Sequence, residues 1–187
     1  LVQGLNIEGK LENLMNEINN LNVDICGISE THWEDSSDFI SELPSKEMFR
    51  IIYSGGDTKR NGVGFILSQR IMKSVSSVII VSDRVIAIRI EATPMNIFIV
   101  QCYTPTFDKS DEEKEEFYGV LRSTINKKMF HEILVLMGDF NSKLGNNKIE
   151  DIVGPYGLGT MNNAGQDLIN FCCEHELFIS NTWYEQK

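Results

Sequence analysis

The sequence has 187 residues, 42% hydrophobic and 24% charged, which is typical of a globular protein and unlike a disordered or collagen-like chain. The longest apolar runs fall far short of the roughly 20 residues that a transmembrane helix needs, and no basic segment followed by an apolar one opens the chain. The net charge of −10 argues against a general nucleic-acid-binding protein, which usually has a basic surface.

The amino-terminal half predicts one helix followed by several strands. Apolar residues at helical spacing predict a helix over Lys10–Leu21, and Val23–Ser29 is typical of a buried strand. The polar segment Thr31–Met48 predicts a loop that Pro44 interrupts. Glycine and asparagine pairs and a proline turn separate the β-rich runs that follow, which predicts hairpins. These runs are Phe49–Tyr53, Val63–Leu67, Val75–Val81, Val85–Ile90 and Ile97–Tyr103.

The carboxy-terminal half predicts two more helices and two more strands. Ser110 and Glu113 form a capping-box pattern at the start of a helix that ends near Lys127 and Lys128. The later segments are a fully apolar, buried strand over Ile133–Met137, a helix over Gly165–His175 and a last strand over Leu177–Ser180. Seven or eight strands and three helices in one domain indicate an α+β fold, with sheets covered by helices.

Two acidic residues stand where core strands end. Glu30 follows the apolar run that closes at Ser29, and Asp139 follows Ile133–Met137 after one glycine. Asn141 lies two residues beyond Asp139, so in extended backbone both side chains point to one side. Carboxylate and amide oxygens suit Mg²⁺. The alternative is that Asp139 and Asn141 are ordinary turn residues.

Tyr103 ends another predicted strand, where its hydroxyl could donate a hydrogen bond to a phosphate oxygen or have a purely structural role. The four cysteines have neither framework nor CxxC spacing, which is typical of a reduced intracellular protein, nuclear or cytoplasmic. The segment from Lys46 to Arg89 carries a charge of +5. This segment forms either a local basic face or a set of charges that solvate strand surfaces.

Four motifs follow one another along the chain. They are Ile28-Ser29-Glu30-Thr31-His32-Trp33, Gly62-Val63-Gly64-Phe65, Gln101-Cys102-Tyr103-Thr104-Pro105-Thr106 and Met137-Gly138-Asp139-Phe140-Asn141. In this order they resemble the endonuclease/exonuclease/phosphatase superfamily. More narrowly, they resemble the apurinic-type endonuclease domain of non-LTR retrotransposons, which craniofacial development protein 2-like proteins share. The segments Ile152–Gly157 and Asn162–Gln166 extend the similarity across nearly the whole chain.

The resemblance implies an α/β fold, a four-layer sandwich of two mixed β-sheets flanked by helices. It also implies phosphodiester hydrolysis of DNA with Mg²⁺, or with Mn²⁺ in its place. By position, Glu30 would bind the metal, Asp139 would orient or activate the attacking water, and Asn141 would hold the water and the phosphate. Tyr103 would contact the scissile phosphate, and Asn162 would lie near the substrate strand.

The chain departs from the family pattern at both ends. An Asn-x-Arg segment is expected near the start, but Leu1 stands at the Asn and Gln3 at the Arg. The chain ends before an expected strand with an Asp and a final Asp-His pair. We therefore expect residues 1–187 to be one truncated domain with negligible nuclease activity by itself. The alternatives are a non-catalytic remnant that binds nucleic acid or protein, and a phosphoesterase for another substrate. No membrane association and no obligate protein partner are expected.

Overall fold

The computed structural model describes residues 4–57 and 59–185. The chain forms two compact units, one of Leu1–Pro105 with Lys109–Asp139 and one of Thr106–Asp108 with Phe140–Lys187. Across the described residues, no helix combines the length and the apolar character that crossing a membrane requires. The expectations for Leu1 and Gln3 lie outside the described residues.

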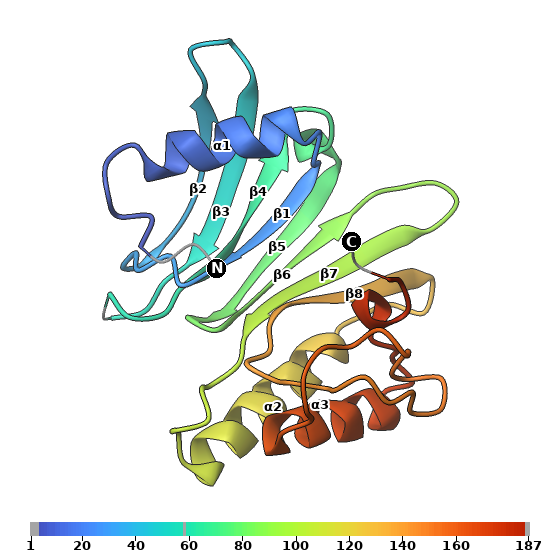
Figure 1. The fold of residues 1–187 in the computed structure, drawn as a ribbon. Helices are drawn as coiled ribbons and strands as arrows, with labels where there is room; N and C mark the ends of the chain where they lie inside the picture. The colour runs from blue at the N-terminus through green and yellow to red at the C-terminus, as the bar shows by residue number, and fades with distance from the viewer. Residues whose placement is uncertain (1–3, 58, 186–187) are drawn as a thin grey trace. The chain divides into compact units, whose positions relative to one another are not determined.

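The first unit begins with a helix and an antiparallel sheet (Figure 1). The helix packs Met15 and Ile18 against the sheet, as its apolar spacing predicts. The sheet has the strand order β1-β4-β3-β2, and every neighbouring pair is antiparallel. The elements are α1 (Lys10–Asn20), β1 (Ile25–Ser29), β2 (Ser36–Glu42), β3 (Met48–Ser54) and β4 (Val63–Ser68).

The second sheet of this unit has the order β5-β6-β7-β8 and is mixed. Its first three strands are antiparallel neighbours, whereas β8 runs parallel to β7 because a crossover through α2 joins them. The elements are η1 (Met72–Ser74), β5 (Val75–Ser82), β6 (Val85–Ile90), β7 (Asn96–Tyr103), α2 (Asp111–Ile125) and β8 (Glu132–Asp139). The second unit contains α3 (Asn163–Glu174) and η2 (Ser180–Thr182).

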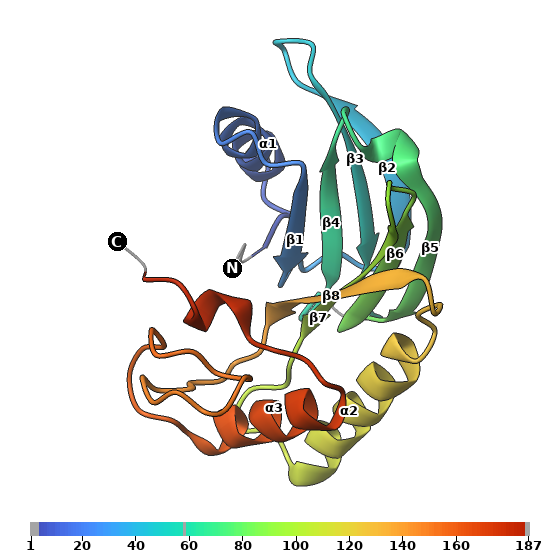
Figure 2. The same ribbon diagram turned by 90° about the vertical axis from the view of Figure 1, so that its right-hand side faces the viewer.

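The first unit has the four layers that the family pattern predicts. A core of apolar residues, among them Phe65, Leu67, Ile86 and Ile99, lies between the two sheets. A separate cluster that includes Ile51 packs under α1, on the side of the first sheet that faces away from β5 and β6 (Figure 2). The helix α2 contacts β6 of the second sheet. The expected fold class is confirmed, except that the first sheet is antiparallel rather than mixed, because β2, β3 and β4 follow one another as hairpins.

The prediction of a loop over Thr31–Met48 is wrong, because the segment contains β2. This strand pairs with β3 only, from Ser36 opposite Ser54 to Glu42 opposite Met48. Most of its side chains are exposed, so its composition is polar and lacks the apolar alternation that marks a half-buried strand. Pro44 lies in the turn between β2 and β3.

The prediction of a last strand over Leu177–Ser180 is also wrong. Ile179 makes a single bridge to Val153, and the chain then turns into η2. The Thr182 hydroxyl donates to the Ile179 carbonyl (2.7 Å) and accepts from the Gly154 N–H (2.7 Å). These side-chain bonds satisfy backbone groups locally and compete with a strand ladder.

The strand β8 lies at the edge of its sheet, although its apolar run predicts full burial. Ile133 is 48% exposed and Val135 is 39% exposed. Their register partners on β7 are Ile97 and Ile99, and Ile99 belongs to the core between the sheets. The apolar side chains of β8 therefore lie on the same face of the sheet as the core residues of β7, but β8 itself is only partly buried.

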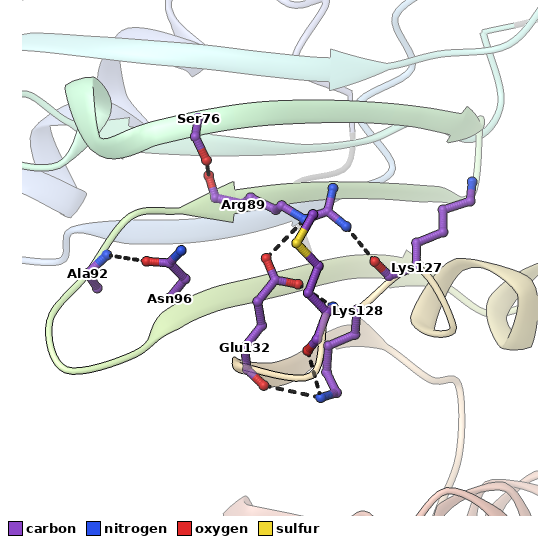
Figure 3. Close-up of polar contacts among 8 residues, drawn as sticks. Ser76, Arg89, Ala92, Asn96, Lys127, Lys128 and Glu132 are labelled. Carbon is purple, nitrogen blue, oxygen red and sulfur yellow. Dashed lines mark hydrogen bonds and ion pairs between the residues drawn. The ribbon is translucent and has the colours of Figure 1, made fainter.

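An ion pair anchors the amino end of β8 (Figure 3). Arg89 on β6 donates from Nε to Glu132 Oε1 (2.9 Å), and the Glu132 side chain is 1% exposed. Glu132 Oε2 accepts from the Met129 N–H (2.7 Å), and the Arg89 guanidinium lies 4.8 Å from the centre of the Phe98 ring. The Lys128 ammonium donates to the Glu132 carbonyl (3.2 Å). These contacts fix the start of β8 against the rest of the sheet.

Replacing Glu132 with alanine leaves the half-buried Arg89 guanidinium without its carboxylate. We expect Glu132→Ala to lower the free energy of unfolding by about 3–5 kcal/mol, measured by urea denaturation. Glu42→Ala is the matched control, because it breaks an exposed ion pair with Lys46. That change is expected to cost less than about 1 kcal/mol. Equal losses in the two variants would contradict a buried anchor at Glu132.

Candidate active site

The first carboxylate of the site follows directly after β1. Glu30 has a φ of 58°, a left-handed conformation that is uncommon for a residue other than glycine. Two neighbouring segments hold it, because the Gly4 N–H donates to the Glu30 carbonyl (3.0 Å) and the Thr31 N–H donates to the Gly62 carbonyl (3.2 Å). A Cβ on Gly62 would lie 2.1 Å from Thr31 Oγ1, so only glycine allows this approach.

Tyr103, the last residue of β7, reaches Glu30 from the opposite sheet. The Tyr103 hydroxyl donates a short hydrogen bond to Glu30 Oε1. The other carboxylate oxygen, Glu30 Oε2, is buried and has no hydrogen-bond partner among the described residues. Because a phenol has one proton, Tyr103 donates that proton to Glu30 in this geometry, and its contact with a phosphate stays a prediction.

The second carboxylate ends β8. Asp139 stands opposite Tyr103 in the parallel register of β7 and β8, and its carbonyl accepts from the Thr104 N–H (2.9 Å). The preceding Gly138 has a φ of 148°, and a Cβ there would lie 2.0 Å from the Cys102 carbonyl oxygen. Glycine at position 138 therefore lets the chain bring Asp139 close to the end of β7.

The thiol beside this carboxylate remains protonated. Burial raises the pKa of the Cys102 thiol well above its usual range, and the charge of Asp139 raises it further. Cys102 is therefore a core residue rather than a nucleophile.

A cation also lies at this end of the sheets. Arg84, in the turn between β5 and β6, donates from Nη1 to the Tyr103 carbonyl (3.1 Å). Its own carbonyl accepts from the Tyr103 N–H (2.9 Å), and its guanidinium lies 5.1 Å from the centre of the Tyr103 ring. At this range the ring face attracts the cation. Arg84 thus brings a positive charge next to the Tyr103 ring.

The donor set fits a hard cation that keeps most of its water. Within residues 4–57 and 59–185, no group of three or more His, Cys, Asp and Glu side chains is placed to hold a metal. Mg²⁺, however, is usually bound through one or two carboxylates plus waters and substrate phosphates rather than by a full protein cage. The buried Glu30 Oε2, without a hydrogen-bond partner, is the kind of atom that such a cation would satisfy.

Residues 4–184 match the model of the Endonuclease/Exonuclease/phosphatase family. The chain belongs to this family. The Craniofacial development protein 2 of Bos taurus is 35% identical over 179 residues, which cover 95% of this chain and 29% of that protein. The protein of the same name from Tragulus javanicus is 34% identical over 179 residues, with 95% and 30% covered. The chain thus spans less than a third of the length of these curated relatives.

A solved structure also shares the family fold. The endonuclease domain of TRAS1, a telomere-specific non-LTR retrotransposon, matches with a TM-score of 0.53 and 15% identity. The match covers 86% of this chain and 62% of that domain. Nuclease and phosphoesterase chemistry is therefore the activity class of the family to which this chain belongs.

Two of the predicted site residues of this family member belong to the second unit. Asn141 follows β8 with a φ of 46°. Asn162 caps α3, where its Oδ1 accepts from the Gly165 N–H (2.9 Å) and the Lys143 N–H (3.0 Å). This capping gives Asn162 a structural role, while contact with substrate stays a prediction. The first unit brings together Glu30, Tyr103 and Asp139.

Sequence reasoning gave neither Arg84 nor Gln101 a role of its own, although Gln101 opens the motif Gln101–Thr106. Arg84 entered the prediction only as one charge in a basic segment, although it lies in the turn before a β-rich run. Gln101 is a polar residue within the apolar run Ile97–Tyr103, and that interruption was the signal for a specific role. The structure places Gln101 fully inside, with its amide reaching β1.

The raised pKa of Cys102 makes stability sensitive to alkaline pH. The unfolded chain loses this proton above pH 9, the ordinary thiol pKa, whereas the folded chain retains it. The free energy of unfolding should therefore fall as pH rises above 9, by up to about 1.4 kcal/mol per pH unit. We expect Cys102→Ala to reduce this alkaline slope in urea denaturation, and the slope that remains to come from Cys26 and Cys172, whose pKa is also raised by burial. The exposed Cys173, replaced by alanine, is the control and should leave the slope unchanged.

Proposed function

We propose that this chain forms part of a Mg²⁺-dependent active site that hydrolyses phosphodiester bonds in DNA. One observation carries the proposal. Glu30 has one carboxylate oxygen held by the Tyr103 hydroxyl, and the other is buried with no partner among the described residues. Family membership and the fold of a retrotransposon endonuclease domain support DNA as the substrate.

In this proposal Glu30 holds the metal, with Mn²⁺ able to take the place of Mg²⁺. When bound, such a cation polarises a phosphoryl oxygen and lowers the pKa of coordinated water. Tyr103 orients the Glu30 carboxylate through its hydrogen bond. Arg84, whose guanidinium lies over the Tyr103 ring, neutralises charge on the phosphate. Asp139 orients the attacking water and accepts its proton. The roles predicted for Asn141 and Asn162, which belong to the second unit, stay predictions.

The predicted base is tested by Asp139→Asn in the gene product that carries this chain. This change preserves shape but removes the proton acceptor, so nicking of supercoiled plasmid with Mg²⁺ should fall by about 10²–10⁴-fold. Asp167→Asn is the matched control, because Asp167 is an exposed carboxylate on α3. Nicking by the Asp139→Asn protein at the parent's rate would rule out the assigned role.

The predicted metal ligand is tested by Glu30→Gln in the same gene product. The glutamine can still accept from Tyr103, but it carries no charge for a cation. Because changes outside the ligand set already weaken metal binding about 10–100-fold, removing the ligand should raise the Mg²⁺ dissociation constant at least about 100-fold. Calorimetric titration measures this constant. Glu116→Gln, at an exposed position on α2, is expected to leave it unchanged.

The same gene product separates the other two candidate functions. A non-catalytic module would bind DNA without cutting it in Mg²⁺ or Mn²⁺, and its affinity would fall with salt according to the number of phosphate contacts. A phosphoesterase for another substrate would hydrolyse a small phosphodiester and leave the plasmid intact. Either outcome would contradict the proposed DNA hydrolysis.

A further inference from the structure

The polar side chain of Gln101 lies in the apolar core between the two sheets. On β7 it shares a face with Ile99 and Tyr103, which both belong to that core. Gln101 is 1% exposed. Burying an amide costs free energy that an apolar side chain of similar size would avoid, so its bonds must offset this cost.

Those bonds reach directly across to the end of β1. Gln101 Nε2 donates to the Ser29 hydroxyl (3.0 Å) and to the Ile28 carbonyl (3.3 Å). Glu30 follows Ser29 directly after β1, and Tyr103 is the next residue after Gln101 on the same face of β7. The Gln101 amide therefore bonds to Ile28 and Ser29, and the Tyr103 hydroxyl bonds to the next residue, Glu30.

On β1, Gly27 leaves room for the Gln101 side chain. A Cβ on Gly27 would lie 2.0 Å from Gln101 Oε1 and 2.9 Å from Met137 Cε. Any larger residue at position 27 would push the amide away from Ser29. Gly27 and Gln101 are thus complementary in shape, and the amide lies against the backbone of β1.

We infer that Gln101 is a positioning residue, which holds the end of β1 so that Glu30 meets Tyr103 and presents its second oxygen to a metal. The inference rests on the proposed function for its consequence, but the structural link stands on the contacts alone. Glu30 has a left-handed backbone and needs external support. Its backbone bonds to Gly4 and its side-chain bond to Tyr103 act on Glu30 itself, whereas Gln101 fixes the two residues before it.

The test is Gln101→Met, which keeps an unbranched side chain of similar length over Gly27 and removes both donated bonds. We expect hydrogen exchange at residues 28–31 to speed up at least about tenfold, and the Mg²⁺ dissociation constant to rise about 10–100-fold, as for other residues that orient metal ligands. Thr124→Val is the matched control. It removes the buried hydrogen bond from Thr124 to Val120 in α2, far along the chain from the site. It should change neither quantity.

A second variant guards against failure of the first to fold. Ser29→Ala leaves the Ile28 carbonyl as an acceptor and should shift both quantities in the same direction by a smaller factor. Parent-like exchange and parent-like Mg²⁺ affinity in both variants would overturn the inference. If the parent protein binds no Mg²⁺, the metal part of the proposed function fails, and the exchange rates at residues 28–31 alone decide the role of Gln101.

Discussion

Face-to-face packing of the two sheets is the constraint on which the site depends. Apolar side chains such as Phe65 and Ile86 fill the space between them and set which strands lie opposite one another. As a result, β1 lies against β7 and β8, and the carboxyl ends of the three strands meet. Because the strands are rigid, they fix the positions of the functional side chains at their ends.

Within that frame, each site residue is held by a different kind of contact. Glu30 depends on segments that are distant in sequence, because the Gly4 N–H donates to its carbonyl and the next residue, Thr31, donates to the Gly62 carbonyl. Asp139 depends on register, because a shift of one residue in β8 would turn its side chain to the other face of the sheet. The ion pair between Arg89 and Glu132 opposes such a shift from the far end of the strand. Stability and site geometry are therefore linked along the whole of β8.

The parts of this molecule that were predictable from sequence are those with a strong local signal. The apolar spacing of α1 and the capping box at Ser110 both predict helices that the structure contains. The wrong predictions concern segments whose structure depends on tertiary neighbours. The edge strand β2 lacks apolar alternation because solvent covers it, and Leu177–Ser180 has the composition of a strand but no sheet to join.

The site shows the same division between local and non-local information. Glu30 and Asp139 were identifiable because each follows a strand-like run, and motif order identified Tyr103. The bond between Tyr103 and Glu30 joins residues 73 positions apart, and the contact of Arg84 with Tyr103 spans a hairpin. No pattern in a single sequence specifies such pairings. They follow from how the two sheets pack.

The net negative charge of the chain makes the position of single cations at the candidate site important. The chain has a net charge of −10, and most cations of the +5 segment contact carboxylates. The pairs are Lys46–Glu42, Arg50–Asp38, Lys59–Glu34, Arg70–Asp24 and Arg89–Glu132. Arg84 differs in that its guanidinium lies over the ring of Tyr103, whose hydroxyl donates to the candidate metal ligand Glu30. An acidic protein that takes a phosphodiester must offset repulsion at the point of contact, where a cation at low dielectric acts most strongly. In the proposed function, a divalent metal at Glu30 together with Arg84 would supply positive charge at that point.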